Sequence, residues 1–208
     1  MGETECYRCT ASWSRRDEAR PFTRSVSMAS SKLKYETCSL QIKLPDSFIE
    51  KVQEWSRRHI SDELLYDDET KTYGRDTHNH ITLSLGLRDD EIDAYAEIVS
   101  EYIGSELSLT NIGVFEMQNF DVIFLEVQED DVLTQLYNKI TPMANKKYVR
   151  RSFKPHVSIA FVRRGLGKKI VKQLSWHDRS LLEKFEFTLD EVELVTREGQ
   201  FVPIRMKG

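Results

Sequence analysis

The order of apolar and polar positions along the chain predicts strands and helices that alternate. Apolar side chains recur at every second position in 35–44, which is the period of a strand with one buried face. They recur at helical spacing in 46–55, where Asp46 or Ser47 can cap the helix. The same two periods continue along the chain and predict the remaining elements. These are strands near 78–87, 108–117, 121–128, 156–163, 183–197 and 200–206, and helices near 89–103, 131–144 and 165–174.

Two of these strands share an unusual pattern. The stretches T-H-N-H-I-T-L-S-L (77–85) and K-P-H-V-S-I-A-F-V (154–162) each place a histidine two residues before a hydroxyl side chain. Side chains two positions apart in a strand share a face and stand about 6.6–7 Å apart. The pairs expected on one face are His80 with Thr82 and His156 with Ser158. The residues expected on the opposite face are Ile81, Leu83, Leu85, Val157, Ile159 and Phe161.

The two strands also suggest how the chain is organised. Each is followed by a predicted helix, which suggests two similar α+β halves. A chain of 208 residues is long enough for one domain with a sizeable core or for two small lobes. Residues 1–33 are rich in Ser, Arg and Thr and lack apolar periodicity, so they predict a flexible tail. Residues 34–208 are then expected to form the folded part.

Composition narrows the class of protein. No stretch approaches the roughly 20 apolar residues that span a bilayer, and the N-terminus lacks the apolar core of a signal peptide. Three cysteines are an odd number, so a framework of disulfides is not expected. We therefore expect a cytoplasmic protein, with the nucleus as an alternative location. We expect no membrane partner and a monomer.

Charge is distributed unevenly along the chain. The net charge is −4, yet 132–177 contains no Asp or Glu. The same segment has eleven Lys and Arg residues and includes the second histidine strand. A polarised chain of this kind can attract an anion locally although the whole protein is acidic. A solvated basic face is the alternative interpretation, and the position of the histidine strand favours the anion.

The chemistry of the repeated pair indicates a phosphate site. Imidazole titrates at about pH 6.5, so two facing imidazoles can act as general base and general acid near neutrality. A hydroxyl beside each can donate a hydrogen bond to a phosphate oxygen. A single such histidine would usually belong to a hydrogen-bonded core. Two copies in matching halves favour displacement at phosphorus without a metal or cofactor.

His78 leaves a second interpretation open. The spacing H-N-H puts His78 on the same face as His80 and Thr82. Two histidines at this spacing could bind zinc, but a further ligand would have to come from elsewhere in the fold. We choose His80 as the functional residue because it stands in the same relation to its hydroxyl as His156 does.

H-I-T-L at 80–83 and H-V-S-I at 156–159 resemble the paired H-x-(T/S)-hydrophobic motifs of the 2H phosphoesterase superfamily, which includes RNA-ligase-like and cyclic phosphodiesterase proteins. The approach R-S-F-K-P-H resembles the second motif of that family in particular. The resemblance extends over about residues 35–208 in the order of elements.

The resemblance implies a bilobal α+β fold, with two antiparallel sheets and flanking helices around a central cleft. It implies that His80 and His156 are the general acid and base, in either order, and that Thr82 and Ser158 hold phosphate oxygens. It also implies substrates with 2′,3′-cyclic phosphates, 2′-5′ linkages or RNA 3′ ends. No metal or cofactor is implied.

Four further residues are candidates for substrate contacts. Tyr73 and Tyr148 could stack on a base, a contact worth about 1–3 kcal/mol, or could anchor loops. Arg151 and Lys154 precede the second motif and could reach a substrate phosphate or lie at the solvated surface.

The leading hypothesis is therefore a metal-independent phosphodiesterase acting on RNA ends or oligonucleotides. A non-catalytic RNA- or nucleotide-binding module on the same fold is one alternative. A metal-dependent hydrolase that uses His78 and His80 is the other.

Overall fold

A computed structural model describes residues 36–67, 73–128, 131–149 and 152–204. The predicted tail at 1–33 lies outside this part of the chain, and so does Arg151. The strands are β1 (Cys38–Lys43), β2 (His80–Leu87), β3 (Glu106–Glu116), β4 (Phe120–Val127), β5 (His156–Arg163), β6 (Glu186–Thr188), β7 (Val192–Val195) and β8 (Phe201–Pro203). The helices are α1 (Asp46–His59), α2 (Ile92–Ser100), α3 (Asp131–Ile140), α4 (Gly167–Gln173) and α5 (Trp176–Ser180), with short 3-10 turns η1 (Asp62–Leu64), η2 (Asp89–Glu91), η3 (Thr141–Met143) and η4 (Lys146–Tyr148).

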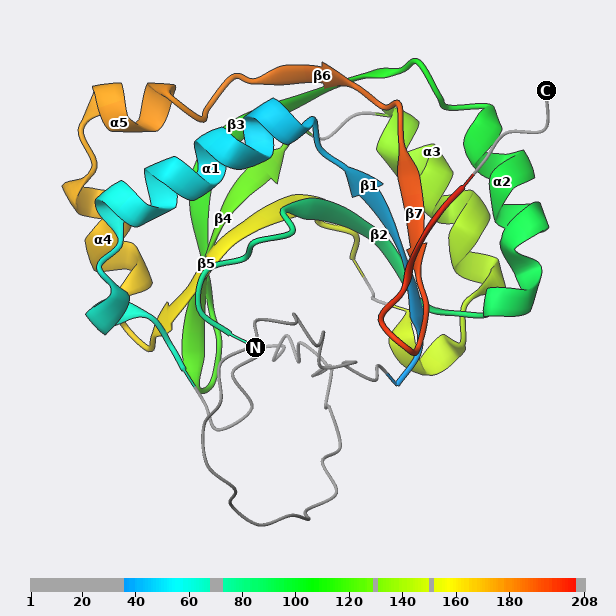
Figure 1. The fold of residues 1–208 in the computed structure, drawn as a ribbon, viewed down its shortest axis with the longest axis horizontal. Coiled ribbons are helices and arrows are strands. Elements are labelled where there is room, and N and C mark those ends of the chain that lie inside the picture. Colours follow the sequence, from blue (N-terminus) through cyan, green and yellow to red (C-terminus); the bar gives the residue numbers. More distant parts are fainter. Residues whose placement is uncertain (1–35, 68–72, 129–130, 150–151, 205–208) are drawn as a thin grey trace, which may run out of the picture.

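The strands form one curled antiparallel sheet in the order β6-β3-β4-β5-β2-β1-β7-β8. The sheet bends into an arch in which β5 and β2 lie at the centre (Figure 1). The prediction of an α+β fold is confirmed. Two separate sheets are not confirmed, because the pair Ile81 and Val157 joins β2 to β5 and makes the sheet continuous.

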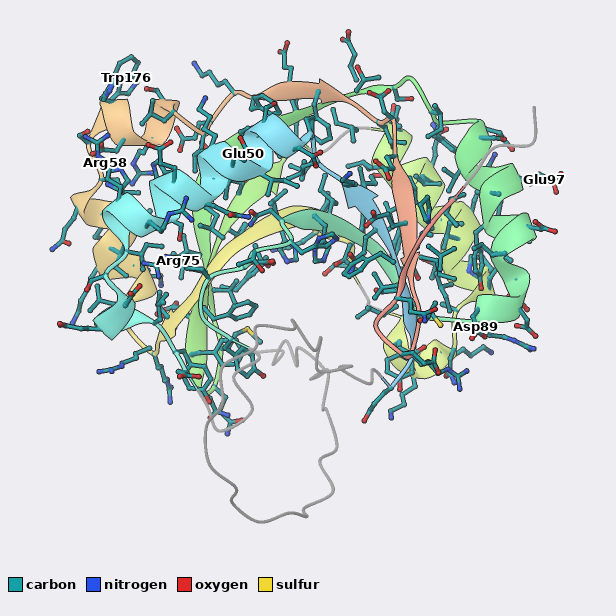
Figure 2. The ribbon with its side chains drawn as sticks, in the orientation of Figure 1. Glu50, Arg58, Arg75, Asp89, Glu97 and Trp176 are labelled. Atoms are coloured by element: carbon teal, nitrogen blue, oxygen red, sulfur yellow. The ribbon has the colours of Figure 1, made fainter. Side chains whose placement is uncertain are left out.

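Among the described residues, the helices lie on the outer side of the arch, and none of them covers the inner side of β2 and β5 (Figure 1). One group, α1, α4 and α5, lies at the end of the arch that contains β3 and β4, and α2 with α3 lies at the other end. Helix α1 buries Phe48, Val52 and Trp55, as its apolar spacing predicts. The indole N–H of Trp55 donates to the carbonyl of Asp178 at 2.8 Å and so fixes α5 to α1. At the outer end of this group, Trp176 points into solvent (Figure 2).

Both histidine strands contain a bulge at the same position of the motif. On β2, Thr82 lies opposite Gln41 and Ser84 lies opposite Leu40, so Leu83 is an extra residue with no partner position on β1. On β5, the corresponding extra residue is Ile159, because Ser158 pairs with Phe124 and Ala160 pairs with Ile123.

The bulges correct one expectation from the period of two. An extra residue reverses the alternation of faces beyond it. Leu85 and Phe161 therefore do not join Ile81 and Val157 in the core, but lie partly exposed on the same side as the histidines. The order of buried and half-buried positions is identical over the first seven residues of β2 and β5.

Among the residues described, no helix is long and apolar enough to cross a membrane.

Candidate active site

The two histidine motifs meet at the centre of the sheet. Ile81 on β2 lies opposite Val157 on β5 in an antiparallel pair, and both side chains are fully buried in the core. In an antiparallel pair the neighbouring positions also face one another, so the register places His80 opposite Ser158 and Thr82 opposite His156. The pleat directs these four side chains to the inner side of the arch, and all four are half-buried.

The register sets the spacing of this quartet, defined as His80, Thr82, His156 and Ser158. Directly opposite side chains begin about 4.5–5.5 Å apart, and diagonal ones about 7–8 Å apart. The imidazoles occupy one diagonal and the hydroxyls the other. A tetrahedral anion at the centre of the quartet could therefore meet an imidazole on two opposite sides.

Both imidazoles are oriented by the same kind of contact. Nδ1 of His80 lies 2.5 Å from the carbonyl oxygen of His78, and Nδ1 of His156 lies 2.8 Å from the carbonyl oxygen of Lys154. A carbonyl oxygen can only accept, so each Nδ1 must carry the hydrogen. In the neutral ring the lone pair is then on Nε2. An imidazole held in this way can accept a proton at Nε2, and its protonated form can donate one there.

The buried Asn79 connects the two motifs. Its side chain is 1% exposed, and its amide nitrogen donates to the carbonyl of Ser158 at 2.7 Å. This bond links the residue before the first histidine to the hydroxyl residue of the second motif. The sequence shows Asn79 only as the middle letter of H-N-H, and its role could not be found without the register.

His78, the residue of the metal hypothesis, lies beside His80 with their ring centroids 5.9 Å apart. Its Nε2 lies 3.2 Å from a carboxylate oxygen of Glu193, and its ring packs against Phe201. Within the described ranges, no three His, Cys, Asp or Glu side chains are grouped closely enough to hold a metal ion. The described residues therefore offer no third ligand beside His78 and His80.

Two aromatic rings, those of Phe115 and Phe124, pack against His156. Phe115 on β3 stacks on Phe124 on β4 with centroids 3.9 Å apart, and both rings meet His156 edge to face. Gly113, which pairs with Phe124, makes room for this ring, since a Cβ there would come within 2.6 Å of it. The sequence alone did not reveal this pair of rings, because their contact with His156 depends on the register between β3, β4 and β5.

Tyr148 and Lys154 lie near two residues of the quartet. Both line one surface hollow together with Thr82 and His156. Tyr148 packs closely over Gly86 of β2, and its hydroxyl donates to Glu36 at 3.1 Å.

Tyr73 lies elsewhere. Its ring contacts those of Tyr66, Phe120 and Phe161 at centroid distances of 4.9–5.2 Å. The nearby Arg75 (Figure 2) pairs with Ala160 of β5, so the loop that contains Tyr73 is tied to the middle of that strand, beyond the second motif. The structure does not bring Tyr73 into the hollow of Tyr148.

Lys43 is a cation that sequence reasoning missed. It lies opposite His80 on β1, and directly opposite residues of a pair share a face. Its ammonium group is 3.2 Å from Glu191 and 3.4 Å from Asp46. The hydrogen bond to Glu191 is the main cause that raises the pKa of Lys43, so the side chain stays protonated and paired with these carboxylates.

Fold and site together define a class of protein. It is an antiparallel α+β protein in which two histidine and hydroxyl pairs, one from each half of the chain, share the inner face of adjacent strands. The family model that describes the 2′-5′ RNA ligase superfamily matches residues 44–201 of the sequence. The chain belongs to this superfamily, and the resemblance to 2H phosphoesterases is confirmed.

Solved structures share the fold at low sequence identity. Escherichia coli LigT in apo form has a TM-score of 0.54 at 15% identity, over 83% of this chain and 96% of that one. LigT complexed with 3′-AMP has a TM-score of 0.54 at 16% identity, with the same coverage of 83% and 96%. Kluyveromyces marxianus Usb1 with uridine monophosphate has a TM-score of 0.52 at 11% identity, over 82% and 98%. No curated protein matches the sequence significantly. Membership of the superfamily supports a phosphodiesterase-type function.

Proposed function

We propose that this protein is a metal-independent phosphodiesterase that acts on RNA ends or oligonucleotides, at a 2′,3′-cyclic phosphate or a 2′-5′ linkage. The observation that carries the proposal is the quartet. Two imidazoles with the same Nδ1–carbonyl contact lie on one diagonal of an antiparallel pair, and two hydroxyls lie on the other.

The reaction needs one proton removed and one delivered. In hydrolysis of a cyclic phosphate, one neutral imidazole takes a proton from water through Nε2 as the water oxygen bonds to phosphorus. The bond from phosphorus to a ribose oxygen breaks, and the other, protonated imidazole gives its proton to that oxygen. In cleavage of a linkage, a neighbouring ribose hydroxyl replaces the water. The two histidines exchange protonation states, and solvent restores them.

The diagonal arrangement suits this displacement. Attacking and leaving oxygens lie roughly in line on opposite sides of phosphorus, so base and acid must also be on opposite sides. Thr82 and Ser158 would donate hydrogen bonds to the non-bridging oxygens from the other diagonal. These side chains supply proton transfer and positioning without a metal.

A nucleotide substrate is supported by the surroundings of the quartet. Lys154 and Tyr148 share a hollow with Thr82 and His156. We assign Lys154 and Arg151 to substrate phosphates and Tyr148 to stacking on a base. Tyr73 would stack on a more distant base, beyond the second motif. The structures of LigT with 3′-AMP and of Usb1 with uridine monophosphate are consistent with a nucleotide ligand.

The test is hydrolysis of a substrate panel by purified protein. The panel contains 2′,3′-cyclic mononucleotides and 2′-5′ and 3′-5′ oligonucleotides, with the ends of each product identified. We expect His80→Ala and His156→Ala each to lower kcat by about 10²–10⁴-fold on the active substrate. His177→Ala, at an exposed position of α5, is the matched control and should keep full activity.

Three outcomes would contradict parts of the proposal. Full activity of either histidine variant would remove that residue from the mechanism. Loss of activity in EDTA, restored by a divalent cation, would favour the metal-dependent hydrolase. Nucleotide binding without turnover on any member of the panel would favour the binding module.

A further inference from the structure

Each motif holds in place the carbonyl that contacts its histidine, but the two motifs do so in different ways. In each, the carbonyl two residues before the histidine accepts from its Nδ1. In the second motif, Pro155 stands between Lys154 and His156, and the proline ring locks its own φ and restricts the residue before it. Pro155 is buried, and its carbonyl accepts from the backbone N–H of Val127 at 3.2 Å. The carbonyl of Lys154 is therefore held by stiff backbone.

The first motif has no proline at the corresponding position, which is Asn79. Side chains hold this segment instead. The backbone N–H of His78 donates to Asp76 at 2.9 Å, and Asn79 donates to the carbonyl of Ser158. The imidazole of His78 is held from a distant strand, because its Nε2 lies 3.2 Å from a carboxylate oxygen of Glu193 on β7.

Glu193 is an unusual residue for a strand interior. It is 7% exposed, and a carboxylate is rarely buried to this extent without a partner. It pairs with Gln41, which pairs with Thr82, so Glu193 lies on the inner face of the sheet in the same row as the quartet. A negatively charged carboxylate is unexpected on a face proposed to bind phosphate, so Glu193 is expected to have another role there.

The contacts of His78 provide that reason. Its ring is held between Glu193 and Phe201, whose ring centroid is 4.1 Å away. Its own carbonyl is the group that accepts from Nδ1 of His80. Fixing the ring of His78 therefore fixes the acceptor that decides which nitrogen of His80 carries the hydrogen.

We propose that Glu193 is a positioning residue for His80 and acts through the side chain and the carbonyl of His78. The pair Glu193–His78 holds the acceptor carbonyl of the first motif in place, as Pro155 does for that of the second motif. Without this pair, the carbonyl of His78 moves, and the imidazole of His80 no longer keeps its hydrogen on Nδ1. The consequence for rate rests on the proposed function, but the consequence for the tautomer does not.

Nitrogen-15 spectra of the histidine side chains test the inference on the full chain without substrate, because ring nitrogen shifts show which nitrogen is protonated. In the wild type, neutral His80 and His156 should both carry the hydrogen on Nδ1. In Glu193→Ala, His80 should become a mixture of tautomers while His156 is unchanged. Glu193→Gln, whose amide oxygen can still accept from His78, should restore the wild-type pattern. Glu198→Ala, an exposed carboxylate in the β7–β8 turn, is the matched control.

Kinetics add a second measurement on whichever substrate the panel identifies. Glu193→Ala should lower kcat about tenfold, the lower end of losses when a residue that orients a metal-ligating histidine is removed, with little change in KM. If Glu193→Ala does not fold, His78→Phe keeps a ring against Phe201 and removes Nε2, and the same shift at His80 is expected. An unchanged His80 tautomer in the folded variant overturns the inference. A tautomer change in a protein inactive on every substrate supports it and counts against the proposed function alone.

Discussion

Ile81 lies directly opposite Val157, and this one antiparallel pair explains why the chain contains the same motif twice. An antiparallel pair has a local twofold axis at its centre. A tripeptide His-apolar-hydroxyl on both strands, centred on that axis, places the two histidines on one diagonal and the two hydroxyls on the other. Motifs 76 residues apart in the sequence become one symmetric site.

The hydroxyls of the quartet should contribute directly to the rate. Thr82→Val and Ser158→Ala each remove one donor to a charged phosphate oxygen, an interaction worth about 1.5–3 kcal/mol. We expect kcat/KM to fall roughly 10- to 150-fold in each, measured on the substrate that the panel identifies. Thr82→Ser and Ser158→Thr keep the donors and should retain most activity. Equal losses in these conservative variants would point to packing instead of hydrogen bonding.

Asn79 should stabilise the junction of the two motifs. Asn79→Ala removes the bond to the carbonyl of Ser158 and leaves that acceptor without this donor. We expect the free energy of unfolding to fall by about 1–3 kcal/mol, measured by urea denaturation. Asn138→Ala, at an exposed position of α3, should change stability little and serves as the control. A wild-type midpoint for Asn79→Ala would show that the bond contributes nothing.

Gly86 should be required for the position of η4. Its φ is +85°, and a Cβ there would lie 2.9 Å from Cβ of Tyr148. Gly104 has a similar φ of +88° with no atom within 4 Å of its Cβ position, so Gly104→Ala measures backbone strain alone. We expect Gly86→Ala to lower the free energy of unfolding by about 1–3 kcal/mol more than Gly104→Ala. Equal effects in the two variants would show that Tyr148 moves aside with no loss in the free energy of unfolding.

Tyr95 should make stability fall at alkaline pH. Its side chain is buried in α2, and burial is the main cause that raises its pKa from about 10 to about 12. The unfolded chain then releases this proton at a lower pH than the folded protein does. The stabilising contribution is complete below pH 10 and is lost between about pH 10 and 12. Tyr95→Phe has no such proton, so its free energy of unfolding should fall less between pH 9 and 11 than that of the wild type. Parallel pH profiles for the two proteins would contradict the assignment.

Much of the local structure could be predicted from the sequence. Apolar periodicity placed β5 at 156–163, where the structure has His156–Arg163, and it placed the buried face of α1. Helix α5 was missed, although the run S-W-H-D (175–178) at its start contains a capping box between Ser175 and Asp178. The expected cap of α1 at Asp46 or Ser47 was also wrong, because the helix begins at Asp46 with Pro45 before it and no side-chain cap.

The long-range parts of the site could not be predicted in this way. Glu193, Lys43 and Phe124 come from three different strands, and each reaches the motifs through its strand register. The bulge residues Leu83 and Ile159 look like ordinary alternating apolar positions in the sequence. Only their partner strands reveal them as extra residues.

That two strands each present a histidine and a hydroxyl on one face follows from the amino-acid order, because this spacing is a property of a single extended segment. The amino-acid order also indicated the superfamily, through the two motifs. The folded arrangement was needed to learn that the motifs face one another about Ile81 and Val157, that the sheet is single, and that Glu193 reaches His78. Pairing between distant strands depends on packing and bulges along the whole sheet, and no local pattern specifies it.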